Sequence, residues 1–179
     1  MTLANEIVGA ILVALGAAVF LLRCKSGEEI ALKVLRCRQL DVVLMVVAAA
    51  WFLWIVANLG HADFGDYKVP LFIGFLGIST GAILWVPDFL GVRAASAIFM
   101  LASWHFLGAA FGRYDVPARL FMVGTVYAGL FAALYLAAVP YRARDLAMWL
   151  SARPSASAFA GAILAALGAW LMIVPALYY

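Results

Sequence analysis

The sequence predicts an all-α integral membrane protein, a single bundle of six transmembrane helices whose termini both lie on the non-cytoplasmic side. Of its 179 residues, 68% are hydrophobic and only 12% are charged, whereas a soluble domain has about 45–50% apolar and about 25% charged residues. One soluble core cannot bury so much apolar surface, so lipid must solvate much of the chain. Six apolar runs and an uneven distribution of basic residues predict the number and the orientation of the helices.

The six apolar runs are each close to the roughly 20 residues that a helix needs to cross about 30 Å of hydrocarbon. They cover residues 4–22, 42–60, 69–86, 94–112, 120–139 and 156–176. The first run starts beside Glu6, where a cleavable signal peptide has basic residues, and no small-residue cleavage site is followed by a polar segment. We therefore expect this run to stay as a transmembrane helix in a single domain, residues 1–179.

A short amphipathic segment is predicted over residues 26–39, between the first two runs. Ser26 and Glu29 have the spacing of a capping box, and Ile30 and Val34 fall on one side of the helix, beside basic residues. Such a helix suits the inner surface of a membrane with anionic headgroups. A helix that binds a protein partner is the alternative.

Basic residues are concentrated in alternate connections. Nine of the twelve Lys and Arg residues fall in the breaks 23–41, 87–93 and 140–155, and three fall in the other breaks. The positive-inside rule places the nine on the cytoplasmic side and both termini on the other side. With the Ala- and Arg-rich composition, this bias predicts a bacterial inner-membrane protein. The net charge of +3 is explained by topology, and since the sequence has no continuous basic run, we expect no nucleic-acid binding.

Two outer connections share a seven-residue pattern. Residues 64–70 and 111–117 agree at five of seven positions, with a Gly suited to end one helix in a left-handed conformation and a Pro suited to start the next. Either the hairpin of the second and third helices is duplicated in the fourth and fifth, or both hairpins use the same turn residues. The charges beside the shared Tyr are reversed between the copies, so the two loops are expected to pair. The expected pairs are Asp66 with Arg113 and Lys68 with Asp115.

The first and last runs are rich in small residues. Segments 9–17 and 161–169 share eight of nine residues, but Gly-Ala-Ile-Leu also occurs at 81–84 and the two helices run antiparallel, so we interpret the likeness as low complexity. Small residues recur at every fourth position, which lets helices approach closely in lipid. The predicted packing residues are Ala10, Ala14, Ala18, Gly161, Ala165 and Ala169. They are expected to pack within the bundle or against another subunit.

Residues suited to chemistry are scarce. His105 is the one charged or imidazole side chain well inside a run, and His61 ends the second run close to Asp63. Two histidines suit haem ligation, and His61 with Asp63 suits a divalent metal, although a hydrogen bond inside the bundle is the simpler role for His105. Without a further ligand or a catalytic set, we expect no cofactor and favour a role other than catalysis.

The absence of buried charges and of a large soluble domain favours an accessory or scaffold subunit of a larger membrane complex, in contact with lipid and with other membrane subunits or with itself. A transporter or channel for a neutral or lipidic small molecule is the alternative. It predicts a polar cavity near Ser79, Thr80, Thr125 and Tyr127. A cofactor- or metal-binding membrane protein that uses the two histidines is the second alternative.

Overall fold

The computed structural model describes residues 2–60, 64–86, 88–112 and 119–178, and every regular element in them is helical. The elements are α1 (Thr2–Leu21), α2 (Lys25–Val34), α3 (Arg38–Ala57), the 3-10 helix η2 (Gly65–Tyr67), α4 (Lys68–Trp85), α5 (Leu90–Ala110), α6 (Arg119–Ala138), α7 (Arg142–Ser151) and α8 (Pro154–Tyr178). Within these ranges, six helices (α1, α3, α4, α5, α6 and α8) are long and apolar enough to cross a membrane. The chain thus has the make-up of a multi-pass membrane protein.

These six helices match the six predicted runs to within four residues at their starts. The largest differences are in α3 and α5, which begin at Arg38 and Leu90 rather than at 42 and 94. The predicted runs were closed at the nearest charge, whereas a helix accepts charged residues in its first turn when their side chains have partners or reach water. Asp41 and Arg93 are therefore helical residues, with consequences described below.

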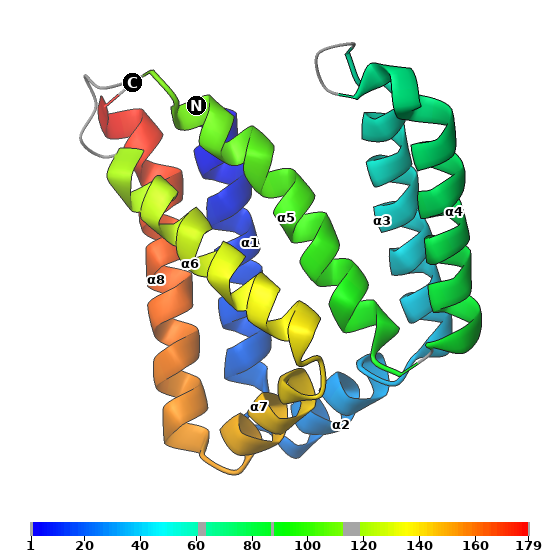
Figure 1. Cartoon of the computed structure of the whole chain (residues 1–179). Helices are drawn as coiled ribbons and strands as arrows, with labels where there is room; N and C mark the ends of the chain where they lie inside the picture. The colour runs from blue at the N-terminus through cyan, green and yellow to red at the C-terminus, as the bar shows by residue number, and fades with distance from the viewer. Residues whose placement is uncertain (1, 61–63, 87, 113–118, 179) are drawn as a thin grey trace.

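The helices form two groups (Figure 1). Helices α1, α5, α6 and α8 pack together, while α3 and α4 form an antiparallel hairpin that joins this group through α3 and α5. Helices α2 and α7 contact each other and lie across one end of the molecule, whereas both termini lie at the opposite end (Figure 1). We call the first end, formed by residues 22–37, 88–89 and 139–153, the basic end, and the other the terminal end.

The buried core lies between α1, α5, α6 and α8. Met122, Val126 and Leu171 are almost completely buried there, and Val8 and Phe106 complete the contact between helices that are distant in sequence. By contrast, no residue of α4 is buried. The hairpin of α3 and α4 is therefore fixed on one side only.

At the basic end the predicted amphipathic helix is present but shorter. Cys24 is its N-cap, no side chain caps it, and it ends at Val34, so the capping box predicted from Ser26 is wrong. Helix α2 packs on α7, a helix that the sequence analysis treated as a connection. In the turn between α7 and α8, the guanidinium of Arg153 lies 4.6 Å from the centre of the Trp149 ring. This is a cation–π contact.

The two copies of the loop pattern differ where the structure describes them. Gly112 has φ +78°, as expected for a glycine that ends a helix. In the other copy the left-handed residue is Phe64, and Gly65 instead lets the chain close on Gly60, since a Cβ at Gly65 would lie 2.5 Å from the Gly60 carbonyl oxygen. Residues 113–117 lie outside the described residues, so duplication of the hairpin stays a prediction.

Candidate functional site

The hairpin of α3 and α4 is attached to α5 through a buried carboxylate. Asp41, in the first turn of α3, is 7% exposed, and its Oδ1 accepts a 3.0 Å hydrogen bond from the backbone N–H of Gly91 at the start of α5. A negative charge is favourable there because two helix N-termini meet at this point. Any side chain at position 91 would collide with the Asp41 carboxylate. A glycine and an aspartate thus allow α3 and α5 to meet closely at this point.

An arginine at the start of α3 holds the last turn of α4. Arg38 donates from Nη2 to the carbonyl oxygen of Ile83 at 3.1 Å, which provides a partner for one of the last carbonyls of α4. A similar contact joins α5 and α6 at the terminal end, where Arg119 donates to the Ala110 carbonyl at 3.4 Å. In both pairs the first residue of one helix bonds to the last turn of its antiparallel neighbour.

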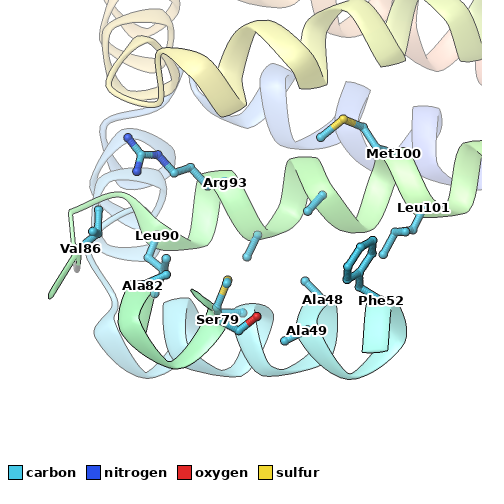
Figure 2. Close-up of a pocket in the computed structure, with 13 residues that line it drawn as sticks. Ala48, Ala49, Phe52, Ser79, Ala82, Val86, Leu90, Arg93, Met100 and Leu101 are labelled. Carbon is cyan, nitrogen blue, oxygen red and sulfur yellow. The ribbon is translucent and has the colours of Figure 1, made fainter. Parts of the chain in front are cut away.

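Beyond this junction, α3, α4 and α5 line an open cavity of about 530 Å³ (Figure 2). This volume is within the range of about 300–1,000 Å³ that is typical of small-molecule sites. Its walls are apolar, with alanines and methionines facing Phe52 and Leu90, and its polar side chains are Ser79 and Arg93. We name it the α3–α4–α5 cavity; it is the candidate site of this protein.

Arg93 supplies the one charge of the lining. Its side chain is exposed, and it makes no hydrogen bond or ion pair with the residues that the structure describes. Figure 2 shows its guanidinium extending back toward the start of α5, away from Phe52 and Leu101 at the other end of the cavity. The cavity therefore has one cationic end and one apolar end.

The outer face of α4 is a second uncovered surface. Gly77 and Gly81 are one turn apart, and a Cβ built on Gly74 or Gly77 would meet no atom within 4 Å. Trp85, which follows on this face, is 82% exposed. The Gly-x-x-x-Gly spacing of 77 and 81 is a known signal for close helix contacts, and the sequence analysis missed it.

The predicted haem site and the predicted metal site each include a residue that the structure does not describe. His61 and Asp63 lie outside the described residues. His105 is exposed on α5, with its ring centre 5.9 Å from that of Trp51 on α3. Within the described residues, no group of three or more His, Cys, Asp or Glu side chains is placed to hold a metal ion.

The polar residues expected around a transport cavity are not brought together. Ser79 lines the α3–α4–α5 cavity, whereas Thr125 lines a separate apolar cavity between α1, α5, α6 and α8. Thr80 and Thr125 each donate to the carbonyl four residues earlier, at 2.8 Å. Tyr127 is exposed. Ser79 and Thr125 thus line two separate, mainly apolar cavities and do not share one polar cavity.

The predicted small-residue faces are only partly used within the chain. Ala10, Ala14 and Ala18 are exposed on α1, as is Ala169 on α8. Gly161 is buried, and the Cβ of Ala165 would lie 3.1 Å from a Cβ placed on Gly16. The backbones of α1 and α8 approach closely at four glycines, at positions 9, 16, 161 and 168, of which only Gly161 is among the predicted packing residues.

The predicted pairing of the two loops falls partly outside the described residues. Asp66 is exposed in η2 and Lys68 is half-buried at the start of α4. Their expected partners, Arg113 and Asp115, are not described. Both pairs stay predictions.

One buried polar residue was also missed. Asn5 on α1 is fully buried, and neither its Nδ2 nor its Oδ1 has a hydrogen-bond partner among the described residues. Its position at the edge of the first run, beside Glu6, made it look like an interface residue. No sequence signal distinguishes it from one.

No protein-family model matches the chain, and comparison with curated proteins and with solved structures found no significant similarity. The features of the structure that bear on function are therefore the α3–α4–α5 cavity and the exposed face of α4.

Proposed function

We propose that this chain is an accessory or scaffold subunit of a membrane-protein complex, and that α4 packs against a transmembrane helix of a partner subunit. The observation that carries the proposal is that α4 has no buried residue, whereas the other five membrane-length helices each have buried residues. Within the chain, α4 contacts only α3 and η2 extensively. One side of a central hairpin helix is thus available for a contact between subunits.

The glycines on that face support a protein partner over lipid alone. Each glycine within a helix costs up to about 1 kcal/mol relative to alanine, and Gly74 and Gly77 make no contact that offsets this cost. Lipid tails gain no specific contact where a side chain is missing. A partner helix gains close packing there, because glycines at this spacing let two backbones approach closely in the membrane.

We expect the basic end to face the cytoplasm, since α2, α7 and the adjacent turns hold most of the basic residues. A bacterial inner membrane is consistent with that bias. The α3–α4–α5 cavity gives the transporter alternative less support, because its lining does not extend to the terminal ends of α3 and α4. A cavity that does not span the bundle suits binding better than passage.

The test is native mass spectrometry of the protein solubilised gently from its host membrane. The proposal expects masses above 19.2 kDa that other polypeptides explain, and loss of those polypeptides when Gly77→Ile blocks the face of α4. Gly124→Ile is the matched control, since Gly124 on α6 also has nothing within 4 Å. A bare chain, a homo-oligomer, or a complex that survives Gly77→Ile would refute the proposal.

A further inference from the structure

The α3–α4–α5 cavity has the dimensions of one leaflet of a bilayer. It is lined by the middle turns of α3, the last turns of α4 and the first half of α5, so it extends inward from the basic end. Arg93 and Leu101 are eight residues apart on α5, which is about 12 Å at 1.5 Å per residue. Half of a hydrocarbon core of about 30 Å is about 15 Å, so along α5 the cavity has about the depth of one leaflet.

Such a cavity needs an apolar occupant. Protein interiors have few voids larger than a water molecule, since unfilled space forfeits dispersion contacts. The walls between Arg93 and Leu101 offer no acidic side chain and one hydroxyl, on Ser79. Water has few partners there, whereas a hydrocarbon chain from the surrounding lipid has many.

The cationic end selects the headgroup. Arg93 has no anionic partner among the described residues, and a guanidinium matches a phosphate with two parallel hydrogen bonds. Two further arginines, Arg36 and Arg38, line a neighbouring hollow with Asp41 and Asp88. Three arginines (36, 38 and 93) against two aspartates leave this neighbourhood with one net positive charge.

We propose that the α3–α4–α5 cavity binds an anionic phospholipid, with the phosphate at Arg93 and one acyl chain between α3, α4 and α5. Basic pockets between transmembrane helices bind anionic lipid headgroups in this way. The site does not depend on a partner subunit, because none of the cavity walls is provided by the outer face of α4.

The test uses the delipidated full chain in mild detergent, with native mass spectrometry to count retained lipids. Phosphatidylglycerol and phosphatidylcholine with the same acyl chains are added in separate titrations. Both lipids offer a phosphate to Arg93, but the choline ammonium makes phosphatidylcholine neutral overall and is repelled by the nearby arginines. We therefore expect one phosphatidylglycerol to be retained about tenfold more tightly than phosphatidylcholine, a difference of about 1.4 kcal/mol. Equal retention of the two lipids would overturn the proposal without the need for any variant.

Two pairs of variants locate the lipid. Arg93→Gln removes the headgroup contact, and its control is Arg153→Gln, at the same end but on the Trp149 ring. Ala49→Phe fills the acyl part of the cavity, and its control is Ala50→Phe, an exposed neighbour that does not line it. The proposal predicts that phosphatidylglycerol binding falls about tenfold in each test variant and is unchanged in each control. Unchanged binding in Arg93→Gln, or equal loss in the controls, would indicate lipid held only at the general surface.

This experiment is separate from the test of the proposed function. Gly77→Ile should leave phosphatidylglycerol retention unchanged, since Gly77 does not line the cavity. A Gly77→Ile chain that loses its partner and keeps its lipid would support both proposals. A Gly77→Ile chain that keeps its partner would refute the proposed function alone, and equal retention of the two lipids by the unchanged chain would refute the lipid site alone.

Discussion

Gly16 of α1 and Gly161 of α8 approach so closely that a Cβ on Gly16 would lie 2.7 Å from the carbonyl oxygen of Gly161, and a Cβ on Gly161 would lie 2.7 Å from that of Gly16. Gly9 and Gly168 form a second reciprocal pair, at 2.7 and 2.6 Å. The glycines are seven residues apart in each helix, so the two pairs are related by a local twofold axis between antiparallel helices. Glycine is required at these positions because backbone atoms occupy the space of a side chain.

Replacement of Gly16 by Ala is expected to destabilise the fold. The new methyl group would meet backbone atoms of α8, and overpacking of this kind costs about 1–3 kcal/mol. The measurement is the midpoint of unfolding in detergent, monitored by circular dichroism. Gly124→Ala is the control: nothing lies within 4 Å of that position, so the better helix propensity of alanine should stabilise it by up to about 1 kcal/mol. A Gly16→Ala variant that is at least as stable as the unchanged protein would show that the close contact of α1 and α8 is not needed for folding.

This contact shows what could and could not be predicted from the sequence. The six helices could be predicted because their apolar length alone distinguishes them. The likeness of 9–17 to 161–169 was interpreted as low complexity, and the antiparallel direction of the helices supported that interpretation. Two like segments can nevertheless pair when antiparallel, around a twofold axis between them. Alanines and glycines recur on several faces of α1, and the sequence does not tell which face is buried.

The candidate site was harder to predict for a different reason. Arg93 was counted as a loop charge that sets orientation, because the predicted run began after it. The cavity depends on how far α3 and α4 diverge from α5, and that angle has no local signature in the sequence. Polar residues in apolar runs were examined instead, and of these only Ser79 lines the cavity.

Loss of the Asp41 carboxylate should loosen the hairpin of α3 and α4. The hydrogen bond to Gly91 is buried and its acceptor is charged, so Asp41→Ala is expected to cost about 1.5–3 kcal/mol. Asp41→Asn keeps an acceptor and should cost less. Asp88→Ala is the control, because this carboxylate is exposed and surface changes are usually within about 0.5 kcal/mol. Equal stability of the Asp41→Ala and Asp88→Ala variants in detergent unfolding would contradict the role of the buried bond.

Replacement of Asn5 by Leu should stabilise the protein. An amide buried without a partner costs about 1–3 kcal/mol, and an apolar side chain of similar size removes that cost. Asn58→Leu is the control, since Asn58 is exposed and donates to the Trp54 carbonyl at 2.7 Å. The same unfolding assay decides the result. A lower stability of Asn5→Leu would mean that Asn5 holds a polar partner, such as a bound water molecule.

The orientation of the chain can be tested with its own thiols. Cys24 is exposed before α2 and Cys37 is half-buried before α3, both at the basic end, and both are free thiols. If the basic end faces the cytoplasm, a membrane-impermeant maleimide should label Cys24 in inverted vesicles and leave it unlabelled in intact spheroplasts. Phe111→Cys, introduced after both native cysteines are changed to Ser, is the control for the terminal end, since Phe111 is exposed there. It should show the opposite pattern. Labelling of Cys24 from outside would place both termini in the cytoplasm, and the headgroup bound by Arg93 would then come from the outer leaflet.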